Sequence, residues 1–250
     1  MPNPLYAERS KREHQVRWLR DLLRAEVLSD AYADGVLPSE AQLMLRYGST
    51  RATVRAALEY LRREGLIERL HGAGTFVVAE RYALRLVELH GVDAAPEPSS
   101  GFSAEMLDRH VVPMPAPVAV HLAEAPGSPC LRVEYLAYHR GQVMALCTNY
   151  LRFPEADAVL RTPLRTHWYQ MLDDAGLVVG ATDLQIEAML ADDHMAELLS
   201  VDVNSAIMGT QQVIRDGDGR PYDFAILRSR GDRLALMARG AGTPRDGAAS

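Results

Sequence analysis

Residues 50–58, which read TRATVRAAL, carry the strongest local signal in the chain. Thr50 is a good N-cap for a helix that begins directly after it, and Gly65 is a typical stop signal. Apolar side chains recur at helical spacing in between, at Val54, Ala57, Leu58 and Leu61. The pattern predicts an amphipathic helix over about residues 51–64.

The neighbouring sequence places this helix in a larger motif. An amphipathic pattern over residues 10–30 predicts a long first helix, and Ser39 with Gln42 forms a capping-box signature at the start of a short second helix. Two β-prone runs, residues 66–70 and 75–78, follow the third helix and are joined by the tight turn HGAG. Two helices linked by a short glycine-containing turn and followed by a hairpin indicate a winged helix-turn-helix.

The third helix carries two arginines on the face opposite its apolar stripe. Arg51 and Arg55 are four residues apart and lie in the first two turns, the part of a recognition helix that meets base edges. An arginine can hold the O6 and N7 atoms of guanine with two hydrogen bonds, and the hydroxyls of Thr50 and Thr53 can donate to phosphate. From spacing alone, a solvated helix face remains an equal alternative.

Composition limits the possible classes of protein. The 250 residues carry a net charge of −6, which argues against a chain that coats nucleic acid through bulk charge. Residues 1–80 hold 12 basic and 11 acidic side chains, so the net negative charge of the chain comes from residues 81–250. No stretch is apolar enough for a membrane span, and the start has no secretory signal. Two cysteines, Cys130 and Cys147, suit a reducing cytoplasm.

The chain divides into four parts. We predict a DNA-binding domain over residues 1–80, a linker over 81–100, a second domain over 101–238 and a disordered tail over 239–250. The second domain alternates strand-like and helical patterns, which predicts an α+β fold with an antiparallel sheet. The strands are expected at residues 131–139, 143–151, 206–215, 221–228 and 234–238, and the helices at 166–176 and 192–200.

Four sequence blocks of the first domain closely resemble the winged helix-turn-helix of GntR-family transcriptional regulators. They read LPSE from residue 37, TRATVRAAL from residue 50, EGLI from residue 64 and GAGTFV from residue 72. The resemblance implies contacts with an operator in double-stranded DNA. With the helix caps and the wing, the predicted set is Ser39, Thr50, Arg51, Thr53, Arg55, Arg69, His71 and Gly72. Ala41 stands where the family has an arginine, so one DNA contact is expected to be missing.

The second domain resembles the UTRA effector domain of the HutC subfamily, which has a chorismate-lyase-like fold. That resemblance implies an antiparallel sheet with helices on one side, and a small-molecule effector pocket. The predicted effector-binding residues are Phe102, Tyr135, Asn149, His167, Tyr169, Asp223 and Ser229. Tyr135 and Ala137 stand where relatives that bind sugar phosphates carry arginines, which disfavours a phosphosugar and favours an uncharged or cationic effector. Tyr135 and His167 have a plain alternative as core residues.

An enzyme is not expected. The sequence has no P-loop and no Gly-x-Ser-x-Gly elbow, and the side chains of Asp192, Asp193 and His194 would point apart on a helix rather than converge on a metal. We predict no cofactor and no metal. Together with the helix-turn-helix pattern, the resemblance to GntR-family regulators implies a bacterial repressor that binds a palindromic operator as a homodimer and is released by a small molecule. The alternative is an effector-independent repressor whose second domain only dimerises.

Overall fold

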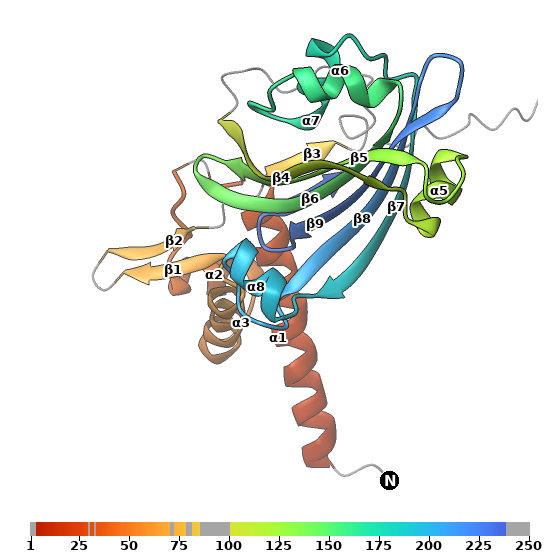
Figure 1. Cartoon of the computed structure of the whole chain (residues 1–250). Helices are drawn as coiled ribbons and strands as arrows, with labels where there is room; N and C mark the ends of the chain where they lie inside the picture. The colour runs from red at the N-terminus through yellow and green to blue at the C-terminus, as the bar shows by residue number, and fades with distance from the viewer. Residues whose placement is uncertain are drawn as a thin grey trace, which may run out of the picture. The chain divides into compact units, whose positions relative to one another are not determined.

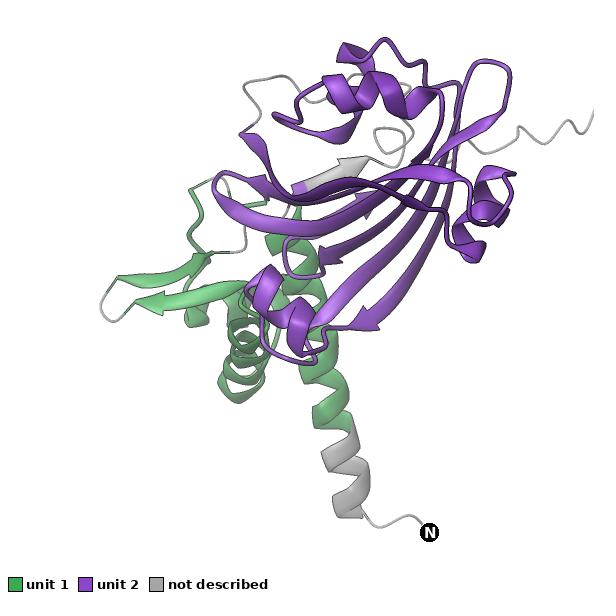
Figure 2. Ribbon diagram, in the orientation of Figure 1, with its two compact units in different colours: residues 1–81 green, residues 82–250 purple. Residues whose placement is uncertain are grey.

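The computed structural model describes residues 4–29, 31–32, 34–70, 73–78, 82–85 and 101–238. The chain forms two compact units, Met1–Arg81 and Tyr82–Ser250, which Figure 2 shows in green and purple. No helix in the described ranges is both long and apolar enough to cross a membrane.

The first unit is built from three helices and a hairpin. Their bounds are α1 (Pro4–Leu28), α2 (Glu40–Tyr47), α3 (Arg51–Arg63), β1 (Ile67–Leu70) and β2 (Gly74–Val77). One apolar core joins all three helices and the start of the hairpin, and its fully buried leucines are Leu19, Leu23, Leu43, Leu61 and Leu66. The arrangement is a winged helix-turn-helix.

Local capping fixes where α2 and α3 begin. The Ser39 side chain accepts a hydrogen bond from the Gln42 backbone N–H at 3.3 Å, and the Gln42 side chain accepts one from the Ser39 backbone at 2.8 Å. Gly48 then ends α2 in a left-handed conformation with φ of 58°, which costs glycine little. Thr50 caps α3 two residues later. These caps set the turn that orients α3 on the core.

The hairpin forms the wing. Strands β1 and β2 pair antiparallel from Ile67 opposite Val77 to Leu70 opposite Gly74. The segment before α2 extends this sheet, because the Leu37 N–H donates to the Thr75 carbonyl at 2.9 Å. The wing is thereby attached to the helix-turn-helix.

The second unit is a six-stranded antiparallel sheet with the strand order β4-β5-β6-β9-β8-β7 (Figure 1). Its strands are β4 (Phe102–Pro113), β5 (Pro129–His139), β6 (Gln142–Arg152), β7 (Ala181–Leu190), β8 (Ala206–Arg215) and β9 (Pro221–Arg230). Its helices are α5 (Ala116–Leu122), α6 (Glu155–Arg161), α7 (Trp168–Asp174) and α8 (Asp193–Leu199).

Helices cover both faces of this sheet, so the expectation of helices on one side was wrong. Helices α6 and α7 pack on one face, where Val133 and Cys147 lie. Helix α8 packs on the other face against Leu136 and Leu146, and α5 packs on that face against Phe224. Alternate residues of the central strands are apolar in both directions, and both sets must be shielded from water.

A separate two-stranded parallel pair completes the second unit. Strand β3 (Tyr82–Arg85) pairs with β10 (Leu234–Met237), with Tyr82 opposite Leu234. Residues 82–85 were expected to be linker, but they form a strand because a partner far along the chain satisfies their backbone groups. The rest of the predicted linker, residues 81 and 86–100, and the predicted tail from residue 239 lie outside the described residues.

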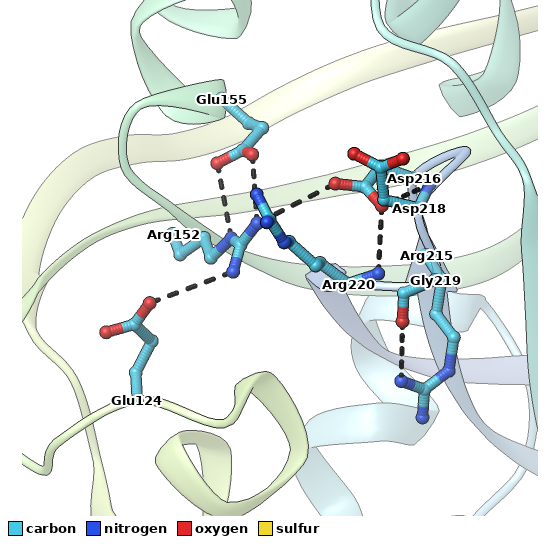
Figure 3. A network of polar contacts seen from close by, with 8 residues as sticks. All are labelled: Glu124, Arg152, Glu155, Arg215, Asp216, Asp218, Gly219 and Arg220. Carbon is cyan, nitrogen blue, oxygen red and sulfur yellow. Dashed lines mark hydrogen bonds and ion pairs between the residues drawn. The ribbon is translucent and has the colours of Figure 1, made fainter.

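An ion-pair network fastens one end of the sheet (Figure 3). Arg152, at the end of β6, lies 3.1 Å from Glu155 and 3.9 Å from both Glu124 and Asp216. Asp216 also accepts from the Arg220 backbone N–H at 2.8 Å inside the β8–β9 turn. The Arg152 side chain is 15% exposed and links α6, the end of α5 and the turn. Its role is structural, because every partner is a neighbouring element of the fold.

Candidate functional sites

Three arginines converge on one carboxylate at the surface of the first unit. Arg51, Arg55 and Arg69 are 73%, 63% and 65% exposed, and each lies near the Glu40 carboxylate, at 3.2, 3.7 and 3.4 Å. Glu40 itself is 17% exposed, in the first turn of α2. We call Arg51, Arg55 and Arg69 the arginine cluster. It draws on α3 and the wing, and its guanidinium groups can form two parallel hydrogen bonds to guanine or phosphate.

The two threonines of the third helix have different surroundings. The Thr50 hydroxyl accepts from the Thr53 N–H at 3.3 Å and lies 2.9 Å from the Thr53 hydroxyl. Thr50 is exposed, whereas Thr53 is 2% exposed. The Thr53 hydroxyl is therefore already used at the start of α3, and its predicted phosphate contact has no support from this geometry.

The remaining predicted DNA contacts lie around the same surface. Ser39 is exposed and caps α2, and Ala41 is exposed in the first turn of α2, where a longer side chain would extend the surface. His71 and Gly72, the predicted wing contacts, lie outside the described residues.

The second unit contains a cavity of about 160 Å³ on the sheet face that α7 covers. Five of the seven predicted effector residues line it: Phe102, Tyr135, His167, Tyr169 and Ser229. Strands β5, β6, β8 and β9 supply its floor, and β3 and β10 supply one wall through Tyr82, Leu234 and Leu236. Most of the lining is apolar, as in other small-molecule sites.

The other two predicted effector residues do not line the cavity. Asp223 is 0% exposed, and it accepts from the Asn149 side chain at 3.0 and 3.1 Å and from the Trp168 indole N–H at 2.5 Å. Burial raises the pKa of Asp223 to about 7, although both hydrogen bonds favour the carboxylate. Asn149 and Asp223 lie on the expected face of the sheet, but farther along their strands, where α7 covers them. They are positioning residues behind the cavity wall.

Trp168 connects this buried carboxylate to the cavity. Its ring lines the cavity and stacks on Tyr135, with ring centroids 5.7 Å apart and planes 7° apart. Asp223 holds the indole in that orientation through the N–H, so the carboxylate fixes an aromatic wall. Sequence reasoning missed Trp168, because helical spacing shows which face of a helix is apolar and not which tertiary contact it makes.

Two further polar side chains are fixed in the lining. The Tyr169 hydroxyl accepts a hydrogen bond from the Gln212 side chain on β8, and this bond orients the hydroxyl. His167 caps α7, and its Nδ1 accepts from the Gln170 backbone N–H at 3.2 Å. That bond needs an unprotonated Nδ1, so the cap favours the neutral imidazole.

Sequence reasoning also missed Tyr82, Leu234, Met208 and Thr210, which share the lining. The alternation of β8 could have indicated Met208 and Thr210, since both are on the face that carries Ser229 of β9. Nothing local to Tyr82 or Leu234 predicts their pairing.

No group of three or more metal-ligating side chains is found in the described part of the chain. Asp192 instead caps α8, accepting from the Met195 backbone N–H at 2.8 Å.

The surface of the first unit and the cavity of the second together define a class of protein, the DNA-binding regulators with a separate ligand-binding domain. Comparison with known protein families supports this class. Residues 16–77 match the bacterial regulatory proteins of the gntR family, and residues 100–235 match the UTRA domain. The chain belongs to the GntR family of transcriptional regulators and carries a UTRA domain. The family is one of regulators, which confirms the expectation that the chain is not an enzyme.

Individual relatives match this chain over most of its length. An uncharacterized HTH-type transcriptional regulator of Rhizobium meliloti is 27% identical over 232 residues, covering 88% of this chain and 92% of that protein. The mannosyl-D-glycerate transport/metabolism system repressor MngR of Escherichia coli is 23% identical, and the match covers 84% of this chain and 88% of MngR. The crystal structure of PhnF from Mycobacterium smegmatis superposes with a TM-score of 0.62 at 20% identity, over 90% of this chain and 100% of that one, which shows a shared fold.

Proposed function

We propose that this regulator is a cytoplasmic homodimeric repressor that binds a palindromic operator and releases it when a small molecule occupies the UTRA cavity. Residues 1–80 read DNA, and residues 101–238 bind the effector and dimerise. The observation that carries the proposal is the arginine cluster, which brings Arg51 and Arg55, at the N-terminal end of a capped recognition helix, together with Arg69 of the wing. Arg51 and Arg55 contact bases, Ser39 and Thr50 contact phosphates, and Arg69, His71 and Gly72 of the wing contact the neighbouring backbone or groove.

The direct test is selection of duplexes from a random library by the purified full chain. A palindromic consensus is expected, because a two-fold symmetric dimer reads two equivalent half-sites. A screen of metabolites for operator release then separates the proposal from its alternative. Release by one metabolite supports an effector-controlled repressor, and binding that no metabolite changes supports an effector-independent repressor.

Glu40 is expected to control how selectively the arginine cluster binds. Glu40→Gln keeps the shape of the side chain but removes the charge that holds all three arginines, so they lose a shared anchor. Binding to scrambled DNA should tighten, because one repulsion from phosphate is lost, while the ratio of operator to scrambled affinity should fall several-fold. Fluorescence anisotropy with both duplexes measures this ratio.

The matched control is Glu59→Gln, which frees two arginines, Arg62 and Arg63, at the other end of the same helix. It should tighten binding to scrambled DNA without lowering the ratio. An unchanged ratio for Glu40→Gln would remove Glu40 from the reading surface.

The second unit is expected to hold the dimer interface. Its edge strands β4 and β7 each pair on one side within the sheet, and both expose apolar side chains: Met106, Leu107, Val111, Ile186 and Leu190. Sedimentation velocity at micromolar concentration should give a dimer for the full chain and for residues 82–250 alone. A monomeric fragment beside a dimeric full chain would move the interface to the first unit.

A further inference from the structure

The charge of the cavity lining restricts its ligand. None of the described residues that line the cavity is Asp, Glu, Lys or Arg. An anion bound there would lose part of its hydration without gaining a Lys or Arg partner, and the one histidine of the lining, His167, already accepts a hydrogen bond at Nδ1.

A cation bound in the cavity would also lack an accessible counter-charge. The nearest candidate counter-charge, Asp223, is fully buried behind Trp168, and both of its oxygens accept hydrogen bonds from protein donors. A ligand would have to displace the Trp168 indole to reach it. The cationic effector that the sequence left open is therefore disfavoured.

The size and walls of the cavity indicate the shape of the ligand. The cavity opens to solvent on one side, and its volume of about 160 Å³ is close to that of an engineered, enclosed apolar cavity of about 150 Å³ that binds benzene. Stacked Tyr135 and Trp168 form one wall, and aromatic rings prefer such neighbours. The hydroxyls of Thr210 and Ser229, on adjacent strands β8 and β9, offer polar groups at the floor.

We propose that the cavity binds an uncharged molecule of about one aromatic ring, bearing a single hydroxyl or similar polar group that hydrogen-bonds to Thr210 and Ser229. This ligand class deepens the proposed effector role and rests on it. It differs from the phosphosugar class, whose dianion needs paired cations.

Three probes of nearly equal size isolate the effect of charge: benzyl alcohol, benzoate and benzylamine. Binding is measured by calorimetric titration of the full chain without DNA. Benzyl alcohol has only eight heavy atoms, which limits its affinity, and its dissociation constant should be about millimolar or tighter. Benzoate and benzylamine should bind at least about ten-fold more weakly, because their charge is unpaired in the cavity.

Variants then locate the bound probe. Thr210→Val with Ser229→Ala should weaken benzyl alcohol several-fold but leave toluene, which has no hydroxyl, unchanged. The matched control is Thr148→Val, a buried threonine on the opposite face of the same sheet, where its hydroxyl donates to Glu134. That variant should change neither probe.

The possible outcomes separate the ligand class from the effector role. Equal or tighter binding of either charged probe, no binding of benzyl alcohol or toluene, or loss of binding in Thr148→Val would each overturn the proposed ligand class. Binding is measured without DNA, so binding of neutral rings that fails to release the operator leaves the ligand class standing and contradicts the effector role alone.

Discussion

Arg55→Ala is expected to weaken operator binding by about ten- to hundred-fold and to relax the sequence preference at one base pair of each half-site. A two-bonded arginine–guanine contact contributes roughly 1–3 kcal/mol of discrimination. The fold should stay intact, because the Arg55 side chain is 63% exposed and its only recorded ion pair among the described residues is with Glu40. Anisotropy titrations with the operator and with single-base variants measure the effect.

Arg63→Ala provides the control on the same helix. Arg63 is 68% exposed at the C-terminal end of α3 and pairs with Glu59. Its loss should lower affinity for operator and scrambled DNA alike, as loss of a general positive charge does. If Arg55→Ala leaves discrimination between operator and scrambled duplex unchanged, Arg55 does not read bases.

The second large effect concerns the pH dependence of stability. The folded chain keeps a proton on Asp223 up to about pH 7, whereas a carboxyl in the unfolded chain releases it near pH 4. The folded state therefore binds more protons in this window, and stability falls as pH rises from about 4 to 7 and levels off above. Between pH 5 and 8 the loss should be about 2–3 kcal/mol.

Asp223→Asn should remove this slope, because the amide does not titrate. Urea unfolding of the full chain at several pH values measures it, in a Trp18→Phe background that leaves Trp168 as the single tryptophan and reports on the second unit. Neighbouring Tyr135, Tyr169 and Tyr222 do not interfere, since burial raises the pKa of each further above this range. Parallel pH profiles for the two chains would show that Asp223 does not hold the proton.

The helix-turn-helix could be predicted from sequence because its signals are local. The capping box at Ser39, the left-handed glycine after α2 and the threonine cap of α3 each act within a few residues. The edge strands β4 and β7 escaped prediction, since their exposed faces mix polar and apolar residues and the alternation is lost.

The cavity could be predicted in part, because the alternation of side chains along a strand is also a local signal. Alternation along β5 and β9 places Tyr135 and Ser229 on one face, and both line the cavity. The same alternation places Asp223 on that face without showing that α7 lies over it. Depth beneath a helix is a tertiary property, and so is the wall that β3 and β10 build.

On the ribosome, β3 emerges about 150 residues ahead of its partner β10. At about 5–20 residues per second, the first unit is complete many seconds before this parallel pair can close. Nascent chains thus acquire the DNA-reading surface first and a complete ligand cavity last. A stop codon shortly before residue 234 would leave the arginine cluster in place but delete one cavity wall, so under the proposed function such an allele should still bind DNA and no longer respond to the effector.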